Sequence, residues 1–174
     1  MEYTSIYGYI KISRDYEASA RYIKNLETDA TYPFITANMF SAGENNYPYY
    51  YENVMISFAA TYKYFGDTED WNYFILKMEN ILRNMDFENA QFHVESSIGD
   101  YTLFWTRHKP YNTSAKEEEK YIEEYRLTKT DEWYFGFGKR SVFTGYPDNE
   151  SPELYEDLRN HPDMGFTYPV KQSS

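Results

Sequence analysis

Hydrophobic and polar residues alternate with a period of two along several segments of the chain, as they do in a β-strand. Near the N-terminus, Ile6 and Ile10 alternate with Tyr7 and Tyr9, which predicts a strand over residues 3–12 that is buried to some extent on both faces. The clearest alternation covers residues 54–64 and predicts a second strand. Residues 92–94 and 101–105 alternate on either side of a short glycine-containing segment, which predicts a β-hairpin.

Segments with helical spacing lie between these strands. Residues 14–26 form an amphipathic pattern, and a stronger apolar stripe runs from Trp71 to Met85 behind a capping candidate at Thr68. A third helix is predicted over residues 115–127, and a short one begins at Ser151-Pro152. Strands are predicted at 133–137 and 141–144, whereas residues 28–50 read as an irregular connection that has a function or contains a short strand.

This order of elements predicts an α+β fold, with a largely antiparallel sheet and helices packed on one of its faces. A doubly wound parallel fold needs strands and helices to alternate strictly. The hairpin over residues 92–105 and the two successive strands at 133–137 and 141–144 break this alternation. The chain contains no internal repeat and no segment that resembles a linker. We therefore expect a single domain over residues 1–161, followed by a loosely ordered tail over residues 162–174.

The composition changes this picture in one respect, because aromatic residues replace aliphatic ones. The chain has 21 Tyr, 12 Phe and 3 Trp, and each buried ring removes a large area from water. There is no Cys, which excludes disulfides and thiolate metal sites. The first residues lack a signal-peptide pattern and no segment is apolar enough to span a bilayer, so we expect a cytoplasmic protein.

The net charge of −11 disfavours direct binding to nucleic acid or to an anionic membrane, since both need basic residues. It favours encounter with a basic partner. Many cytosolic proteins are acidic for solubility alone, so both interpretations of the charge stay open.

The residue types that carry chemistry are sparse. His93 and Glu95 project from one face of a predicted strand, but two ligands are too few for zinc. Residues 136–141 lack the spacing of a phosphate-binding loop. We therefore expect no enzyme activity, no cofactor and no metal, although a pair of carboxylates facing each other across a cleft cannot be recognised from sequence.

Two segments are candidates for binding a partner protein. Tyrosine gives a large contact area and a hydrogen bond for little lost entropy, and Tyr49, Tyr50 and Tyr51 cannot all face inward in an extended segment. The predicted helix over residues 115–127 carries a cluster of acidic residues that either forms a solvated face or meets a basic partner. Its candidate contacts are Glu117, Glu118, Glu119 and Glu123.

Three segments resemble a known family. The first strand, Ile6-Tyr7-Gly8-Tyr9-Ile10, looks like the His-Gly-Trp strand of the family called immunity protein 7, with Tyr7 in place of the histidine. Residues 97–105 are similar to that family's Gly-Ser-Tyr-Gly-Leu-Leu-Tyr segment, with Asp100 inserted in its centre. The acidic residues around Ser151-Pro152 resemble its C-terminal end. The resemblance implies a cytoplasmic bacterial protein that binds and neutralises a cognate toxin.

The leading hypothesis is therefore an immunity-type protein that occludes a toxin, plausibly a basic nuclease domain, with an acidic and Tyr-rich surface. One alternative is an acidic phage or plasmid anti-defence protein that mimics nucleic acid. Another is a small hydrolase that uses paired carboxylates.

Overall fold

The computed structural model describes residues 3–42, 55–65, 68–96, 99–108 and 128–139. These segments form one antiparallel sheet of seven strands in the order β2-β3-β1-β4-β5-β7-β6. The strands are β1 (Tyr3–Ile12), β2 (Phe40–Ser41), β3 (Met55–Lys63), β4 (Phe87–Ser96), β5 (Gly99–Thr106), β6 (Thr128–Lys129) and β7 (Tyr134–Lys139).

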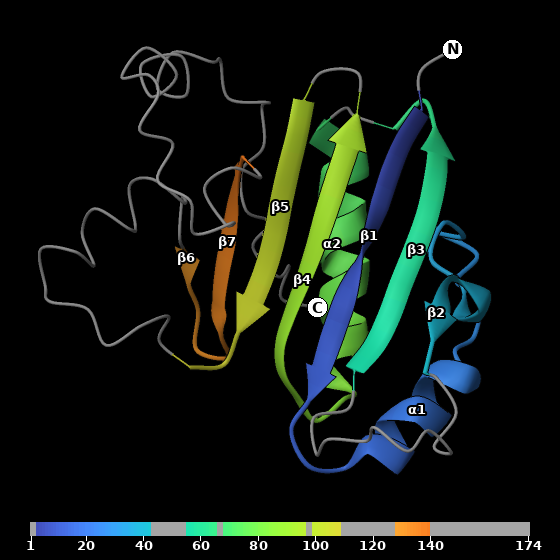
Figure 1. Cartoon of the computed structure of the whole chain (residues 1–174). Helices are drawn as coiled ribbons and strands as arrows, with labels where there is room; N and C mark the ends of the chain where they lie inside the picture. The colour runs from blue at the N-terminus through green and yellow to red at the C-terminus, as the bar shows by residue number, and fades with distance from the viewer. Residues whose placement is uncertain (1–2, 43–54, 66–67, 97–98, 109–127, 140–174) are drawn as a thin grey trace, which may run out of the picture.

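The helices are α1 (Tyr16–Lys24), a 3-10 turn η1 (Ala37–Met39), and α2 (Thr68–Arg83). Since β1 is antiparallel to both of its neighbours, β3 and β4 run parallel to each other on either side of it. Parallel strands need a crossover connection, and α2 provides it by packing along one face of the sheet (Figure 1). The α+β prediction, with an antiparallel sheet and helices on one face, is confirmed.

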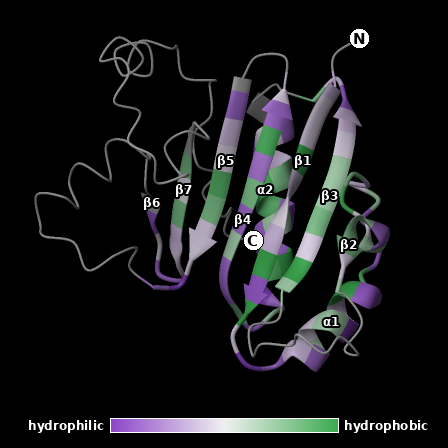
Figure 2. Cartoon of the chain, in the orientation of Figure 1, coloured by the Kyte–Doolittle hydropathy of each residue, from purple (hydrophilic) through white to green (hydrophobic). Residues whose placement is uncertain are grey.

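The core lies between α2 and the sheet. Alternate residues of the central strands enter it, so strongly hydrophobic and more polar positions succeed one another along each arrow in Figure 2. The register places Ile10, Ile56 and Ala90 side by side on three neighbouring strands. Helix α2 covers these strands with a stripe of buried residues: Trp71, Phe74, Ile75, Met78, Ile81 and Leu82.

Aromatic rings hold this core together, as the composition predicted. Phe58 contacts Phe74 and Phe92 edge to face, with ring centroids 6.1 and 5.5 Å apart. Trp105 contacts Phe135 at 5.1 Å. Such geometries are favoured because they bring the positive edge of one ring to the negative face of another. Aromatic and aliphatic side chains therefore share the core, and the ring contacts give it a specific packing.

Several predicted elements lie outside the described residues. They are the helix over 115–127, the strand at 141–144, the helix that begins at Ser151 and the tail over 162–174. Within the predicted irregular connection over residues 28–50, the described part contains η1 and the short strand β2.

Candidate functional site

The face of the sheet opposite α2 carries a group of polar and aromatic side chains from its three central strands. In the described part of the chain this side of the sheet bears no helix (Figure 1). Strand β1 contributes Tyr7 and Tyr9 from the positions between its core isoleucines. We call this surface the outer face and define it by Tyr7, Tyr9, Gln91, His93 and Glu95, which contact the buried Thr102 of β5 through His93.

Both tyrosines of the outer face contact side chains of β4 through their hydroxyls. The Tyr7 hydroxyl donates to Oε1 of Glu95 over 2.5 Å, and the Tyr9 hydroxyl donates to Oε1 of Gln91 over 3.4 Å. Bonds to a carboxylate are shorter and stronger than bonds to a neutral amide, which agrees with this difference. The Tyr7 ring is thus held by a short bond before any partner arrives, whereas the Tyr9 hydroxyl makes only a long, weak contact.

His93 connects this pair to the next strand. Its ring lies 5.7 Å from the ring of Tyr7, centroid to centroid, and its Nδ1 is 3.0 Å from Oγ1 of Thr102 on β5. His93 and Glu95 share one face, as the alternation predicted, and both are half-buried there. Their position opposite the core follows from the burial of Phe92 and Val94 on the other face.

Two titratable groups of β1, Tyr9 and Lys11, lie on or beside the outer face. Desolvation raises the pKa of Tyr9 above its usual value, with Lys11 acting in the opposite direction. Burial thus favours the neutral, hydrogen-bond-donating form of the Tyr9 hydroxyl. Lys11 forms an ion pair with Glu88 on the neighbouring strand, with Nζ and Oε2 2.9 Å apart.

Beside the outer face, the ring of Phe104 on β5 contacts Gly136 on β7. Phe104 is directly opposite Gly136 in the strand pairing, and its ring lies over the glycine in the space where a Cβ would stand. The ring is buried although it lies on the face opposite the core.

The arrangement is suited to binding more than to covalent chemistry. Thr102 has the hydroxyl that lies beside a histidine, but its exposed fraction is 0%. A nucleophile has to reach its substrate, which this hydroxyl cannot do from a fully buried position. Among the described residues, no group of three or more His, Asp or Glu side chains is placed to hold a metal ion.

The binding residues predicted from sequence cannot be placed. Tyr49, Tyr50, Tyr51, Glu117, Glu118, Glu119 and Glu123 all lie outside the described residues. Sequence reasoning did not single out Tyr7 and Tyr9 as binding residues. The sequence did contain a pattern that could have identified them: both tyrosines alternate with the isoleucines that fill the other face of the strand.

The charge of the chain is distributed unevenly. Of 17 basic and 28 acidic residues, ten basic and 13 acidic ones lie in the described segments, which gives these segments a net charge of −3. The remaining −8 belongs to the other segments of the sequence. The outer face thus belongs to a nearly neutral part of the protein.

In the segments that the structure describes, no helix combines the length and apolar character needed to cross a membrane. Comparison of the chain with protein families, with curated proteins and with solved structures gave no match.

Proposed function

We propose that this protein is an immunity-type protein that binds a cognate bacterial toxin and neutralises it by covering the toxin's functional surface. The resemblance of the first strand and of residues 97–105 to immunity protein 7 supports the class of partner. The outer face supports the mode of action, which is occlusion by a preformed surface without catalysis.

The observation that carries this proposal is the pair of half-buried tyrosines on the outer face, of which Tyr7 is held by a short hydrogen bond to Glu95. Tyr7 and Tyr9 project from a central strand, and the hydroxyl of each contacts a side chain of β4. A ring held in place loses little entropy on binding, and tyrosines of this kind are common energetic centres of protein interfaces. A rigid sheet is a suitable support, because the spacing between its side chains is set by the strand pairing.

The outer face favours a protein partner over nucleic-acid mimicry. A mimic of duplex DNA needs carboxylates at regular intervals along an extended surface. On the outer face, Glu95 accepts a hydrogen bond from Tyr7, and the nearby Glu88 is paired with Lys11. Tyrosine is prominent there, and aromatic residues are enriched in protein interfaces.

The acidic helix predicted over residues 115–127 gives the proposal a second, kinetic component. Charged residues at the rim of an interface act mainly on the association rate, and aromatic residues at the centre act mainly on dissociation. We assign the tyrosines of the outer face to the second role and Glu117, Glu118 and Glu119 to the first.

The test uses the cognate toxin domain, which we expect to be encoded in a neighbouring gene. The double variant Tyr7→Ala/Tyr9→Ala should bind that domain about 100-fold more weakly, since two central tyrosines each contribute roughly 1–2 kcal/mol. The matched control is Tyr64→Ala/Tyr73→Ala, which removes two exposed tyrosines from other parts of the molecule. Surface plasmon resonance measures both, with thermal melts to show that the variants fold.

Equal affinity of the Tyr7→Ala/Tyr9→Ala variant and the wild type would remove the outer face from the interface. The triple variant Glu117→Lys/Glu118→Lys/Glu119→Lys is a separate experiment. It should slow association by about tenfold at low salt and by less at high salt, with little change in the dissociation rate. An unchanged association rate would show that these glutamates do not steer the encounter.

A further inference from the structure

A second surface lies at the opposite side of the sheet, between α1 and the short strand β2. It is an open hollow of about 580 Å³, lined by Ala20, Arg21, Lys24, Asn38, Phe40 and Ala42 among others. Phe40 pairs with Phe58, and the two rings are 4.9 Å apart on the core side of the sheet. The hollow is therefore on the side of α2 and separate from the outer face.

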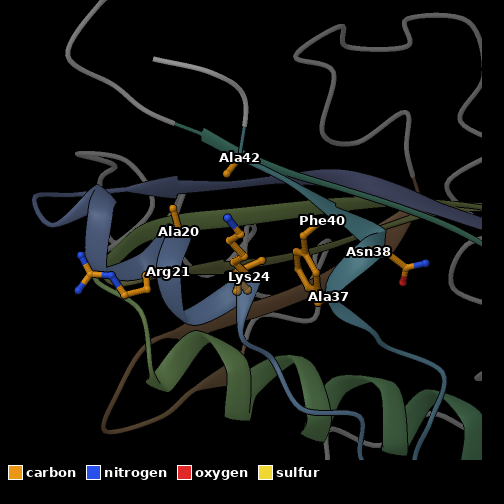
Figure 3. Close-up of a pocket in the computed structure, with 8 residues that line it drawn as sticks. Ala20, Arg21, Lys24, Ala37, Asn38, Phe40 and Ala42 are labelled. Atoms are coloured by element: carbon orange, nitrogen blue, oxygen red, sulfur yellow. The ribbon is translucent and has the colours of Figure 1, made fainter. Parts of the chain in front are cut away.

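Apolar side chains form most of the hollow's surface. Figure 3 shows the Phe40 ring and the Lys24 side chain near the centre, with Ala20 and Ala37 beside them. The alanines leave the space open because their side chains end at Cβ. The hydroxyl of Tyr16 donates to the carbonyl of Ala42, which ties α1 to the residue that follows β2 and fixes the spacing of the two walls.

Two cations stand beside these apolar groups. Arg21 and Lys24 are exposed, and within the described part of the chain no carboxylate lies within ion-pair distance of either. Lys11, Lys77 and Arg83 do have acidic partners, whereas Arg21 and Lys24 resemble Arg14 and Lys63 in having no ion pair within the described segments. The C-terminal end of a helix favours basic residues, which accounts for their sign. It does not account for the apolar hollow that they border.

From this combination we infer that the hollow binds an acidic peptide segment of another protein. One apolar side chain of the peptide packs on Phe40 between the alanines, and carboxylates on either side of it pair with Arg21 and Lys24. The size of the hollow is within the range of small-ligand sites, but its open side admits a chain that passes across it. A purely electrostatic anion site has no need of the apolar wall.

The inference does not depend on the toxin proposal, because the two surfaces use different residues on opposite sides of the sheet. The probe is a short fluorescent peptide with two leucines between pairs of glutamates, titrated with the full chain and followed by anisotropy. Two control peptides have glutamine in place of glutamate or alanine in place of leucine. Both should bind more weakly than the probe.

Two variants of the chain test the two halves of the site. Arg21→Gln/Lys24→Gln should weaken probe binding by roughly three- to tenfold, as expected for the loss of two exposed ion pairs. The control Arg14→Gln/Lys63→Gln makes the same change in net charge away from the hollow and should bind like the wild type. Ala20→Leu fills the hollow without changing charge, suits a helix, and should abolish binding.

Several outcomes would overturn the inference. They are equal binding of the probe by the Arg21→Gln/Lys24→Gln variant and the wild type, equal binding of the glutamine peptide, and full displacement of the probe by inorganic phosphate. A wild-type dimer that the Ala20→Leu variant abolishes, seen by analytical ultracentrifugation, would identify a second copy of the chain as the occupant instead. Thermal melts accompany each variant, and Ala20→Leu remains informative if the loss of the two cations destabilises α1.

Discussion

At the scale of single residues, two neighbouring buried tyrosines differ in how their hydroxyls are satisfied. The Tyr62 hydroxyl donates to the carbonyl of Phe34 over 2.7 Å, whereas the Tyr32 hydroxyl is buried without a partner. We expect Tyr62→Phe to lower the free energy of unfolding by about 1 kcal/mol and Tyr32→Phe to leave it unchanged or raise it by about 1 kcal/mol. Urea unfolding at pH 7 measures both. Similar losses in the two variants would mean that Tyr32 has a bonding partner.

Gly136 is a second residue whose role is set by one contact. A Cβ at this position would overlap the ring of Phe104, which lies across the glycine from the neighbouring strand. We expect Gly136→Ala to cost about 1–3 kcal/mol, as overpacked sites do. In a Phe104→Ala background the same change should cost almost nothing, because the ring is gone. Additive costs in this double-mutant cycle, followed by chemical unfolding, would contradict the proposed contact.

At the scale of elements, periodicity predicted the long strands and helices that lie within the described residues. The strands over residues 3–12 and 54–64, the hairpin and the long helix are all confirmed, with end points that differ by a few residues. Strands β2 and β6 are two residues each, too short for any period to show. Their positions depend on pairing with β3 and β7, which is a tertiary property.

The sequence predicted some residues of the outer face but not how they meet. Alternation alone placed His93 and Glu95 on one side of a strand. It did not bring Tyr7 to Glu95, since these residues are 88 positions apart and meet because β1 pairs with β4 in one particular register. Register depends on turn geometry and on the complete hydrophobic pattern, so a site assembled across strands is hard to derive from one sequence.

One buried carboxylate joins the helix to the sheet. Glu79 of α2 accepts a hydrogen bond from Nε1 of Trp105 over 2.9 Å and lies 3.6 Å from Arg83, which also binds Glu132. Removing Glu79 leaves the indole N–H without its acceptor, so we expect Glu79→Ala to cost about 2–4 kcal/mol. Glu132→Ala removes an exposed partner of the same arginine and should cost at most about 1 kcal/mol. Thermal and urea unfolding compare the two, and equal costs would show that burial of Glu79 is unimportant.

At the scale of the whole molecule, the net charge is distributed unevenly, whereas the tyrosines are divided almost equally, with 11 of 21 in the described segments. Most of the negative charge belongs to segments beyond the described sheet, and the sheet itself is rich in aromatic residues. Under our proposal the acidic residues of the other segments increase the association rate. The side chains of the outer face set the dissociation rate of the complex. Association kinetics should therefore depend on salt more strongly than dissociation kinetics do.

A tyrosine-rich fold also has a characteristic weakness at high pH. Burial raises the pKa of five tyrosines above its usual value, and these are Tyr9, Tyr22, Tyr32, Tyr62 and Tyr101. Their neutral form is favoured in the folded state, whereas in the unfolded chain each loses its proton near pH ~10. The stability that they contribute is fully present below pH ~10 and is lost as the pH rises from there towards the higher pKa of the folded protein.

We therefore expect the free energy of unfolding to be nearly constant from pH 8 to about 9.5 and to fall steeply above pH ~10, by up to about 1.4 kcal/mol per pH unit for each tyrosine that remains protonated. Tyr62→Phe should make this slope shallower by one such contribution. Phe58→Leu is the control, because it destabilises the core without removing a titrating group and should retain the slope. Guanidinium unfolding between pH 8 and 11 gives the slopes, and the same slope for Tyr62→Phe as for the wild type would show that the Tyr62 hydroxyl is not protected by the fold.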